Sequence, residues 1–200
     1  MSLAMEDRSP SHPITVDEFY RMVHVGLVDE SARVELIEGA IIDMAPIGPR
    51  HGYLVDTLTR LLFETVGERA ILRGSGSVRL NNWSEFLPDI ALLKPWKHAY
   101  SRRVPTGADT LLLIEVSDTT LRHDRNRKAP LYARHGFEEL WIVDAKKKII
   151  HFFRGRTESG YDDVTVSARP GVVPLPLANL SVDLTGLFRP GWRRPVARSG

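Results

Sequence analysis

The run LLLIEV at residues 111–116 is the most hydrophobic segment of the chain, and it constrains the fold most strongly. Such a run is typical of a β-strand that is buried on both faces, so its sheet needs covering elements on each side. Glu115 interrupts the run near its end, and a bare carboxylate is costly to bury unless another group pairs with it or coordinates it. The sequence therefore predicts a covered sheet and a partner for Glu115.

Helices and further strands are indicated on both sides of this run. Apolar residues recur at helical spacing over 51–66, and Thr15 with Glu18 forms a capping box that predicts a short helix. The order of elements predicts an α/β fold in which a central mixed sheet is flanked by helices. The segment RVELIEGAIIDMAP is expected to form an N-terminal β-hairpin that turns at Glu38-Gly39. Further strands are expected in AILRG, SVRL, LPDIALLK, ELWIVD and IIHFFR. Another helix is expected from Leu131 to His135.

The composition narrows the class of protein. The sequence has no cysteine, which excludes disulfides, thiolate nucleophiles and thiolate metal sites. It has no run of about 18 apolar residues and no apolar segment near its start, so we expect no membrane span and a cytoplasmic location. The formal net charge of +2 neither demands nor excludes nucleic acid. We expect one domain over 13–188, a disordered or expression-derived leader over 1–12 and a basic flexible tail over 189–200.

Asp89 is a second acid at a strand boundary, because Pro88-Asp89 opens the expected strand LPDIALLK. It precedes Glu115 by 26 residues, so a loop can bring two adjacent strands and both carboxylates to the same edge of the sheet. Two converging carboxylates repel each other, and a divalent cation is one ordinary way of keeping both ionised. Oxygen ligands suit Mg²⁺ or Mn²⁺, which activates water and neutralises a phosphoryl group. The competing interpretation of Asp89 is a turn aspartate after proline.

Hydrolysis of a phosphodiester also benefits from a basic group near the attacking water, and Lys128 is the candidate. It stands close to the start of the helix that follows the LLLIEV strand. Because proline is tolerated only near a helix start, Pro130 predicts that this helix begins within 126–129. Two basic neighbours, Arg125 and Arg127, compete for the same role.

The ordered set of segments resembles the Uma-type family of proteins assigned as restriction endonucleases, a branch of the PD-(D/E)XK nuclease superfamily. The resemblance spans roughly residues 15–187 and rests on VELIEGAIIDMAP, a helix opening at His51, LPDI, IEVSDTT and HDRNRKAPLYARHGFEELWIVD. The set in this order is specific, whereas the PD dipeptide alone carries almost no information. The resemblance implies a restriction-endonuclease-like fold.

The resemblance also implies roles for individual residues. Asp89 and Glu115 would bind the metal, Lys128 would be the catalytic lysine displaced from the strand to the following helix region, and Glu35 would be an additional acid. The usual superfamily pattern has a lysine two residues after the second acid, where this chain has Ser117. This departure makes the lysine assignment weaker than the assignment of the two acids.

Structural roles compete with these functional ones. Glu115 could form an ion pair with an arginine such as Arg79 or Arg122. Glu38 lies on the same hairpin as Glu35, and either could be the additional acid.

Other residues have both structural and functional interpretations. His51 either contacts a phosphate at a helix N-terminus or caps and packs its helix. Arg102 and Arg103, in the basic loop before LLLIEV, are candidates for nucleic-acid contacts, although a solvated loop is the common case. The remaining residues are expected in structural roles, with Asp124 as a cap before Lys128, and Tyr132 and Trp141 in the core.

The primary hypothesis is a metal-dependent endonuclease that acts on DNA with Mg²⁺ or Mn²⁺ as its cofactor. One alternative is a catalytically inactive nucleic-acid-binding or regulatory protein on the same fold, and another is a structural domain whose acids only form ion pairs. A homodimer is the simplest way to cut two strands with one type of site, but the sequence indicates no interface.

Overall fold

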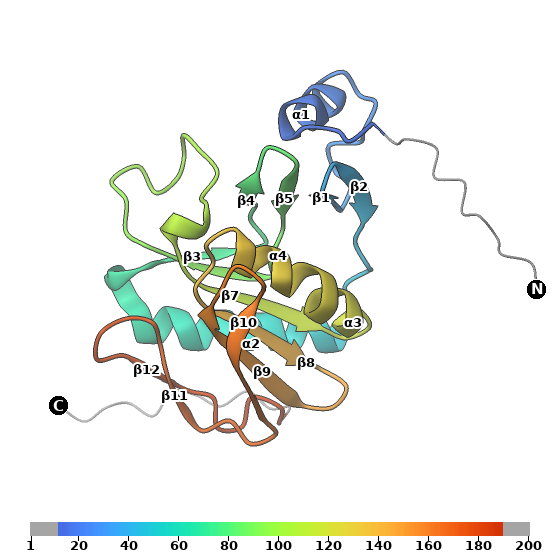
Figure 1. Cartoon of the computed structure of the whole chain (residues 1–200). Helices are drawn as coiled ribbons and strands as arrows, with labels where there is room; N and C mark the ends of the chain where they lie inside the picture. Colours follow the sequence, from blue (N-terminus) through green and yellow to red (C-terminus); the bar gives the residue numbers. More distant parts are fainter. Residues whose placement is uncertain (1–11, 190–200) are drawn as a thin grey trace, which may run out of the picture.

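The computed structural model describes residues 12–189 and is built around a six-stranded sheet in the order β10-β9-β8-β7-β6-β3 (Figure 1). Strands β7 and β8 pair in parallel, whereas the other neighbouring strands of this sheet pair antiparallel. The central sheet is therefore mixed, as predicted. Its strands are β3 Ile71–Gly74, β6 Ile90–Leu93, β7 Thr110–Ser117, β8 Leu140–Asp144, β9 Ile149–Arg156 and β10 Tyr161–Ser167.

Two smaller sheets flank the central one. The predicted hairpin of β1 (Val34–Ile37) and β2 (Ala40–Asp43) is confirmed, and it joins a four-stranded sheet with β5 (Ser84–Phe86) and β4 (Val78–Asn81) in the order β2-β1-β5-β4. Strand β5 lies between SVRL and LPDIALLK, where the sequence indicated no strand. Strands β11 (Val172–Pro174) and β12 (Ser181–Asp183) form a separate two-stranded sheet, whereas β10 is the edge strand of the central sheet.

Helices cover both faces of the central sheet. The helix α2 (Pro49–Val66) lies on one face, and α3 (Leu121–His123) and α4 (Ala129–Arg134) lie on the other (Figure 1). The capping box of Thr15 and Glu18 is present at α1 (Val16–His24), whose Val16 N–H donates to the Asn82 carbonyl in the β4–β5 turn. Single 3₁₀ turns occupy Gly67–Arg69 and Gly107–Asp109. Within residues 12–189, no helix combines the length and the apolar character that crossing a bilayer requires.

The helical segment that carries Lys128 begins earlier than predicted. Helical turns start with α3, continue through a π-helical segment at Asp124–Lys128 and run directly into α4. Pro130 directly follows the π-helical segment, in which Ala129 N–H donates to the Asp124 carbonyl five residues back, so the α-helical hydrogen-bond register is already interrupted where the proline lacks its N–H. The predicted start within 126–129 is therefore wrong for the helical run as a whole, although it matches the start of α4.

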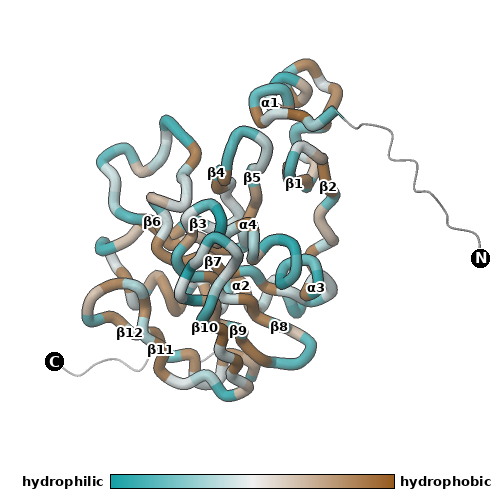
Figure 2. Tube along the Cα trace, viewed as in Figure 1, coloured by the Kyte–Doolittle hydropathy of each residue, from teal (hydrophilic) through white to brown (hydrophobic). Residues whose placement is uncertain are grey.

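Strand β7 is buried on both faces, as its composition predicts. Leu112, Ile114 and Val116 pack with residues of α2, while Leu113 packs on the opposite face with Tyr132 of α4. Hydrophobic residues accordingly lie along the central strands, and many residues of the connecting loops are hydrophilic (Figure 2). Because side chains alternate along a strand, the position of residue 115 falls on the face of α4. The expectations of a leader and a basic tail fall almost wholly outside the described residues.

Candidate active site

Asp89 and Glu115 lie side by side at one end of the central sheet. Ile90 of β6 pairs with Ile114 of β7, so the next positions along the two strands are those of the two acids. Both side chains are nearly inaccessible, since Asp89 is 8% and Glu115 is 5% exposed. The backbone N–H of Val116 donates to Asp89 Oδ2 at 2.7 Å, which fixes one carboxylate against the strand of the other. The predicted convergence of the two acids is therefore present.

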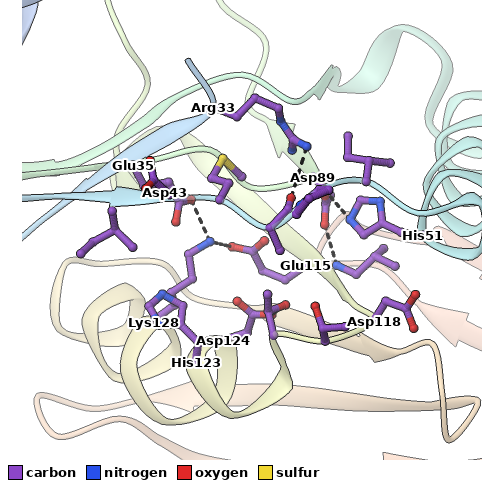
Figure 3. Close-up of a pocket in the computed structure, with 18 residues that line it drawn as sticks. Arg33, Glu35, Asp43, His51, Asp89, Glu115, Asp118, His123, Asp124 and Lys128 are labelled. Carbon is purple, nitrogen blue, oxygen red and sulfur yellow. Dashed lines mark hydrogen bonds and ion pairs between the residues drawn. The ribbon is translucent and has the colours of Figure 1, made fainter. Parts of the chain in front are cut away.

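The two carboxylates line a pocket of about 420 Å³. Its walls come from the β1–β2 hairpin and the loop after it, the first turn of α2, the end of β7 and the helical segment that follows (Figure 3). The charged and imidazole side chains in the lining are Arg33, Glu35, Asp43, His51, Asp89, Glu115, Asp118, His123, Asp124 and Lys128.

Lys128 is the basic residue that reaches the acids. Its Nζ lies 2.8 Å from Glu115 Oε1 and 2.8 Å from Glu35 Oε1, and its side chain is 4% exposed. Arg125 and Arg127 are exposed on the same helical segment and do not line the pocket. Of the three basic candidates, the geometry favours Lys128.

Glu35 is the acid of the hairpin that enters the pocket. It is buried, and its Oε1 accepts hydrogen bonds from the backbone N–H of Leu87 at 2.8 Å and from Lys128. Glu38 is exposed at the β1–β2 turn, where its φ of 52° marks a left-handed turn position. The alternative of Glu38 as the additional acid is therefore not supported by the structure.

Tyr132 makes a polar contact that the sequence did not predict. It is fully buried and packs edge-to-face against Phe86 and Phe137, as expected of a core residue. Its hydroxyl also donates to Glu115 Oε1 at 2.7 Å. The available signal was its position four residues after Lys128, because residues four apart share one face of a helix.

Asp124 ties the helical segment to the end of β7 rather than capping a helix. Its Oδ2 accepts hydrogen bonds from Ser117 Oγ at 2.7 Å and from Thr120 Oγ1 at 2.6 Å. It is buried inside the π-helical segment and lines the pocket. The expected role as a cap before Lys128 is therefore wrong, because the helical run already begins at Leu121.

His51 is directed to Asp89 from the first turn of α2. Its Nε2 lies 3.1 Å from Asp89 Oδ1, and its Nδ1 is buried without a hydrogen-bond partner among the described residues. The hydrogen bond to Asp89 raises the pKa of His51, although burial acts in the opposite direction. The contact of His51 with a phosphate stays a prediction.

The two loop arginines lie away from the pocket. Strands β6 and β7 are antiparallel, so the loop between them joins the strand ends that lie away from Asp89. At about 3.3 Å per residue along β6, these ends are about 16 Å from Asp89. Arg103 pairs with Asp109 and lies 4.9 Å from the centre of the Trp96 ring, and Arg102 is exposed. Neither lines the pocket, so their nucleic-acid contacts stay a prediction without support from the site.

The structural interpretations of two other residues can also be assessed. Arg79 pairs with Glu85 at 3.0 Å and Arg122 is exposed, so the competing interpretation of an arginine partner for Glu115 is not supported, and Lys128 pairs with Glu115 instead. Trp141 is fully buried and donates its Nε1–H to Glu139, which confirms its place in the core.

Burial and like charge make the pocket electrostatically unusual. Burial raises the pKa of Glu115 to about 8, and the nearby acids Asp124, Glu35 and Asp89 raise it as well, against the attraction of Lys128. Burial also acts to lower the pKa of Lys128, but the carboxylates of Glu115 and Glu35 more than offset this and raise it. Lys128 therefore keeps its charge, while Glu115 is held in an environment that has more carboxylates than cations.

The donor set fits a hard divalent cation. Asp89 and Glu115 offer oxygen ligands from adjacent strands, and a cation would favour the ionised form that burial of Glu115 disfavours. Within residues 12–189, no group of three or more His, Asp or Glu side chains is arranged so that it could hold a metal ion. Two carboxylates are sufficient for Mg²⁺, which usually keeps several waters and completes its coordination with substrate oxygens.

Comparison with known proteins adds the family. Among solved structures, the fold is similar to that of "a putative nuclease belonging to DUF820 from Anabaena variabilis ATCC 29413", with a TM-score of 0.68, 19% identity, and coverage of 88% of this chain and 98% of that chain. This similarity confirms the restriction-endonuclease-like fold. No curated protein matches the chain. The family model described as "Uma2: Putative restriction endonuclease" matches residues 16–185, and the chain therefore belongs to the Uma2 family, as the resemblance of its segments predicted.

Proposed function

We propose that this chain is a metal-dependent endonuclease that hydrolyses phosphodiester bonds in DNA. The observation that carries the proposal is the adjacency of Asp89 and Glu115 on paired strands, with Lys128 held 2.8 Å from Glu115. Membership of a family described as restriction endonucleases supports the reaction class. Two acids and a lysine in one buried pocket are the groups that this reaction needs.

Asp89 and Glu115 would hold Mg²⁺ or Mn²⁺. Bound there, the ion would supply positive charge to the phosphoryl oxygens and lower the pKa of water. Asp89 is oriented by Val116 N–H and His51, and Glu115 by the Tyr132 hydroxyl and Lys128. Each carboxylate is therefore held in one direction before any ligand enters.

Lys128 would act as a hydrogen-bond donor rather than as a base. Its pKa is raised by Glu115 and Glu35, so the ammonium group keeps its protons and neutralises negative charge that develops on the phosphate. Glu35 accepts from both Leu87 N–H and Lys128, so it fixes the direction of the Nζ. In this mechanism Glu35 is a positioning residue.

The test is cleavage of supercoiled plasmid DNA with Mg²⁺ or Mn²⁺. Asp89→Asn, Glu115→Gln and Lys128→Met should each abolish cutting, while circular dichroism shows that each variant folds. Lys146→Met is the matched control, because Lys146 is exposed in the β8–β9 turn outside the pocket. A wild-type protein that binds DNA but never cuts it with either metal would indicate an inactive binding protein. Absence of both binding and cutting would refute the proposed function.

A further inference from the structure

The pocket repels the substrate proposed for it unless cations offset its charge. Six carboxylates line it, whereas the permanently charged basic residues in the lining are Arg33 and Lys128. Lys128 is already shared by Glu115 and Glu35. A phosphodiester that enters therefore meets mostly negative groups, so basic side chains at the rim have to contribute to binding. The carboxylates are Glu35, Asp43, Asp89, Glu115, Asp118 and Asp124.

Two basic side chains of the lining are not engaged in an ion pair with any of the described residues. Arg33 is exposed just before β1, and its guanidinium makes a hydrogen bond of 3.4 Å to the Ala45 carbonyl. His123 ends α3 and is partly exposed. By contrast, His51 is engaged with Asp89. Arg33 and His123 are therefore available to a ligand.

Arg33 and His123 lie on opposite sides of the proposed metal-binding carboxylates. In Figure 3, Arg33 stands above Asp89 and Glu115, whereas His123 lies below them beside Lys128. The two side chains come from different elements, the segment before β1 and the helical segment after β7. An anion that reaches both must therefore extend across the pocket.

We propose that Arg33 and His123 bind the phosphates on either side of the phosphodiester that is cut. This inference rests on the proposed function and adds which side chains hold the DNA strand on either side of the bond that is cut. A DNA strand carries one negative charge per nucleotide, so it presents phosphates on both sides of an internal bond. Contacts with phosphates fix the register of the strand and carry no direct sequence information.

The first test measures binding of a fluorescently labelled DNA oligonucleotide by anisotropy at several salt concentrations, with Ca²⁺ as the divalent ion. Arg33→Gln should weaken binding about tenfold and reduce the slope of log affinity against log salt by about 0.7 to 0.9, the value for one lost phosphate contact. His123→Gln should also weaken binding. Arg169→Gln is the matched control, because Arg169 is exposed between β10 and β11 and does not line the pocket.

The second test separates the rim from the centre of the site. Bis(p-nitrophenyl) phosphate is a phosphodiester without flanking phosphates, so the ratio of kcat/KM on DNA to kcat/KM on this compound should fall about tenfold in Arg33→Gln. Equal loss on both substrates would overturn the proposal, because Arg33 would then act at the centre or on the fold. Unchanged DNA affinity and salt slope in Arg33→Gln would also overturn it. Absence of DNA binding by the wild type would instead remove the proposed function itself.

Discussion

Two buried glutamates, one in β7 and one just before the neighbouring strand β8, differ in the balance of charge around them. Glu139, just before β8, is 8% exposed and accepts hydrogen bonds from Trp141 Nε1 and Arg154 Nε, so it has a cation of its own. Glu115, in β7, is 5% exposed and shares its single cation, Lys128, with Glu35.

This difference separates a structural ion pair from a candidate site. A buried carboxylate is satisfied by one cation and one good hydrogen bond, and such pairs occur throughout protein interiors. A group of carboxylates that outnumbers its cations is strained in the absence of a ligand. Burial of an acid therefore indicates little by itself, whereas the excess of acids around Glu115 indicates a cation or a proton as the missing partner.

The largest expected effect separates the two glutamates by activity. Glu115→Gln should lower DNA cleavage about 1000-fold, because a metal ion contributes several kcal/mol to charge stabilisation. Glu139→Gln should leave kcat within about twofold and instead lower the free energy of unfolding by about 1–3 kcal/mol, since Trp141 and Arg154 lose a charged acceptor. Plasmid cleavage and urea unfolding of both variants measure the two effects. Similar activity of the two variants would remove the distinction.

The next largest effect is the response of stability to a cation. Mg²⁺ at about 100 times its dissociation constant should add about 2.7 kcal/mol to the free energy of unfolding, which raises Tm by several degrees. Glu139→Gln should keep this increase, and Glu115→Gln should lose most of it. Thermal unfolding with and without Mg²⁺ measures the change in the absence of DNA. An equal rise of Tm in Glu115→Gln would mean that the ion binds elsewhere.

Two tyrosines allow a finer test of the Glu115 environment. Tyr132→Phe removes the hydroxyl that donates to Glu115 and should weaken Mg²⁺ binding about 10- to 30-fold, the range expected when a ligand loses its orienting hydrogen bond. Tyr161→Phe removes a hydroxyl that donates at 2.7 Å to the Phe137 carbonyl and should leave the affinity unchanged. Isothermal titration calorimetry measures both affinities. If both variants bind Mg²⁺ as the wild type does, the Tyr132 hydroxyl has a structural role alone.

The features that the sequence predicted share a local cause. Strand β7 and helix α2 follow from hydrophobic periodicity, because burial selects apolar residues at fixed spacings. Glu115 was recognisable because it violates that pattern, and Asp89 because it opens the adjacent strand. Their adjacency then follows from antiparallel pairing of β6 and β7 across one loop.

The features that were missed depend on contacts between distant segments. Strand β5 is three residues long and contains Glu85, which is buried only because Arg79 and Tyr20 pair with it. The helical run starts early because a π-helical segment precedes α4. In the sequence, Pro130 instead indicates a helix that starts close to the proline. Tyr132 is an ordinary core residue until β7 brings Glu115 to its hydroxyl. Such contacts have no signature in local periodicity.

Asp109 is an acid that, like Glu139, has a cation of its own. The pH dependence of its contribution to stability is the smallest effect that we expect. The hydrogen bond from Arg103 lowers the pKa of Asp109 to about 2, with further lowering by Thr106 against the effect of burial. A lowered pKa stabilises the folded state above the unfolded value of 3.8, and this stability is lost as the pH falls from about 3.8 through about 2. Because Arg103 is exposed, solvent screens the pair, and its contribution should stay below about 1 kcal/mol. Asp109→Asn and Arg103→Gln should therefore both flatten the acid limb of the stability curve, measured by urea unfolding between pH 2 and pH 5, whereas Arg169→Gln should not. If the free energy of unfolding of Asp109→Asn falls with pH as steeply as that of the wild type, other carboxylates cause the acid sensitivity. The Arg103–Asp109 pair would then contribute little.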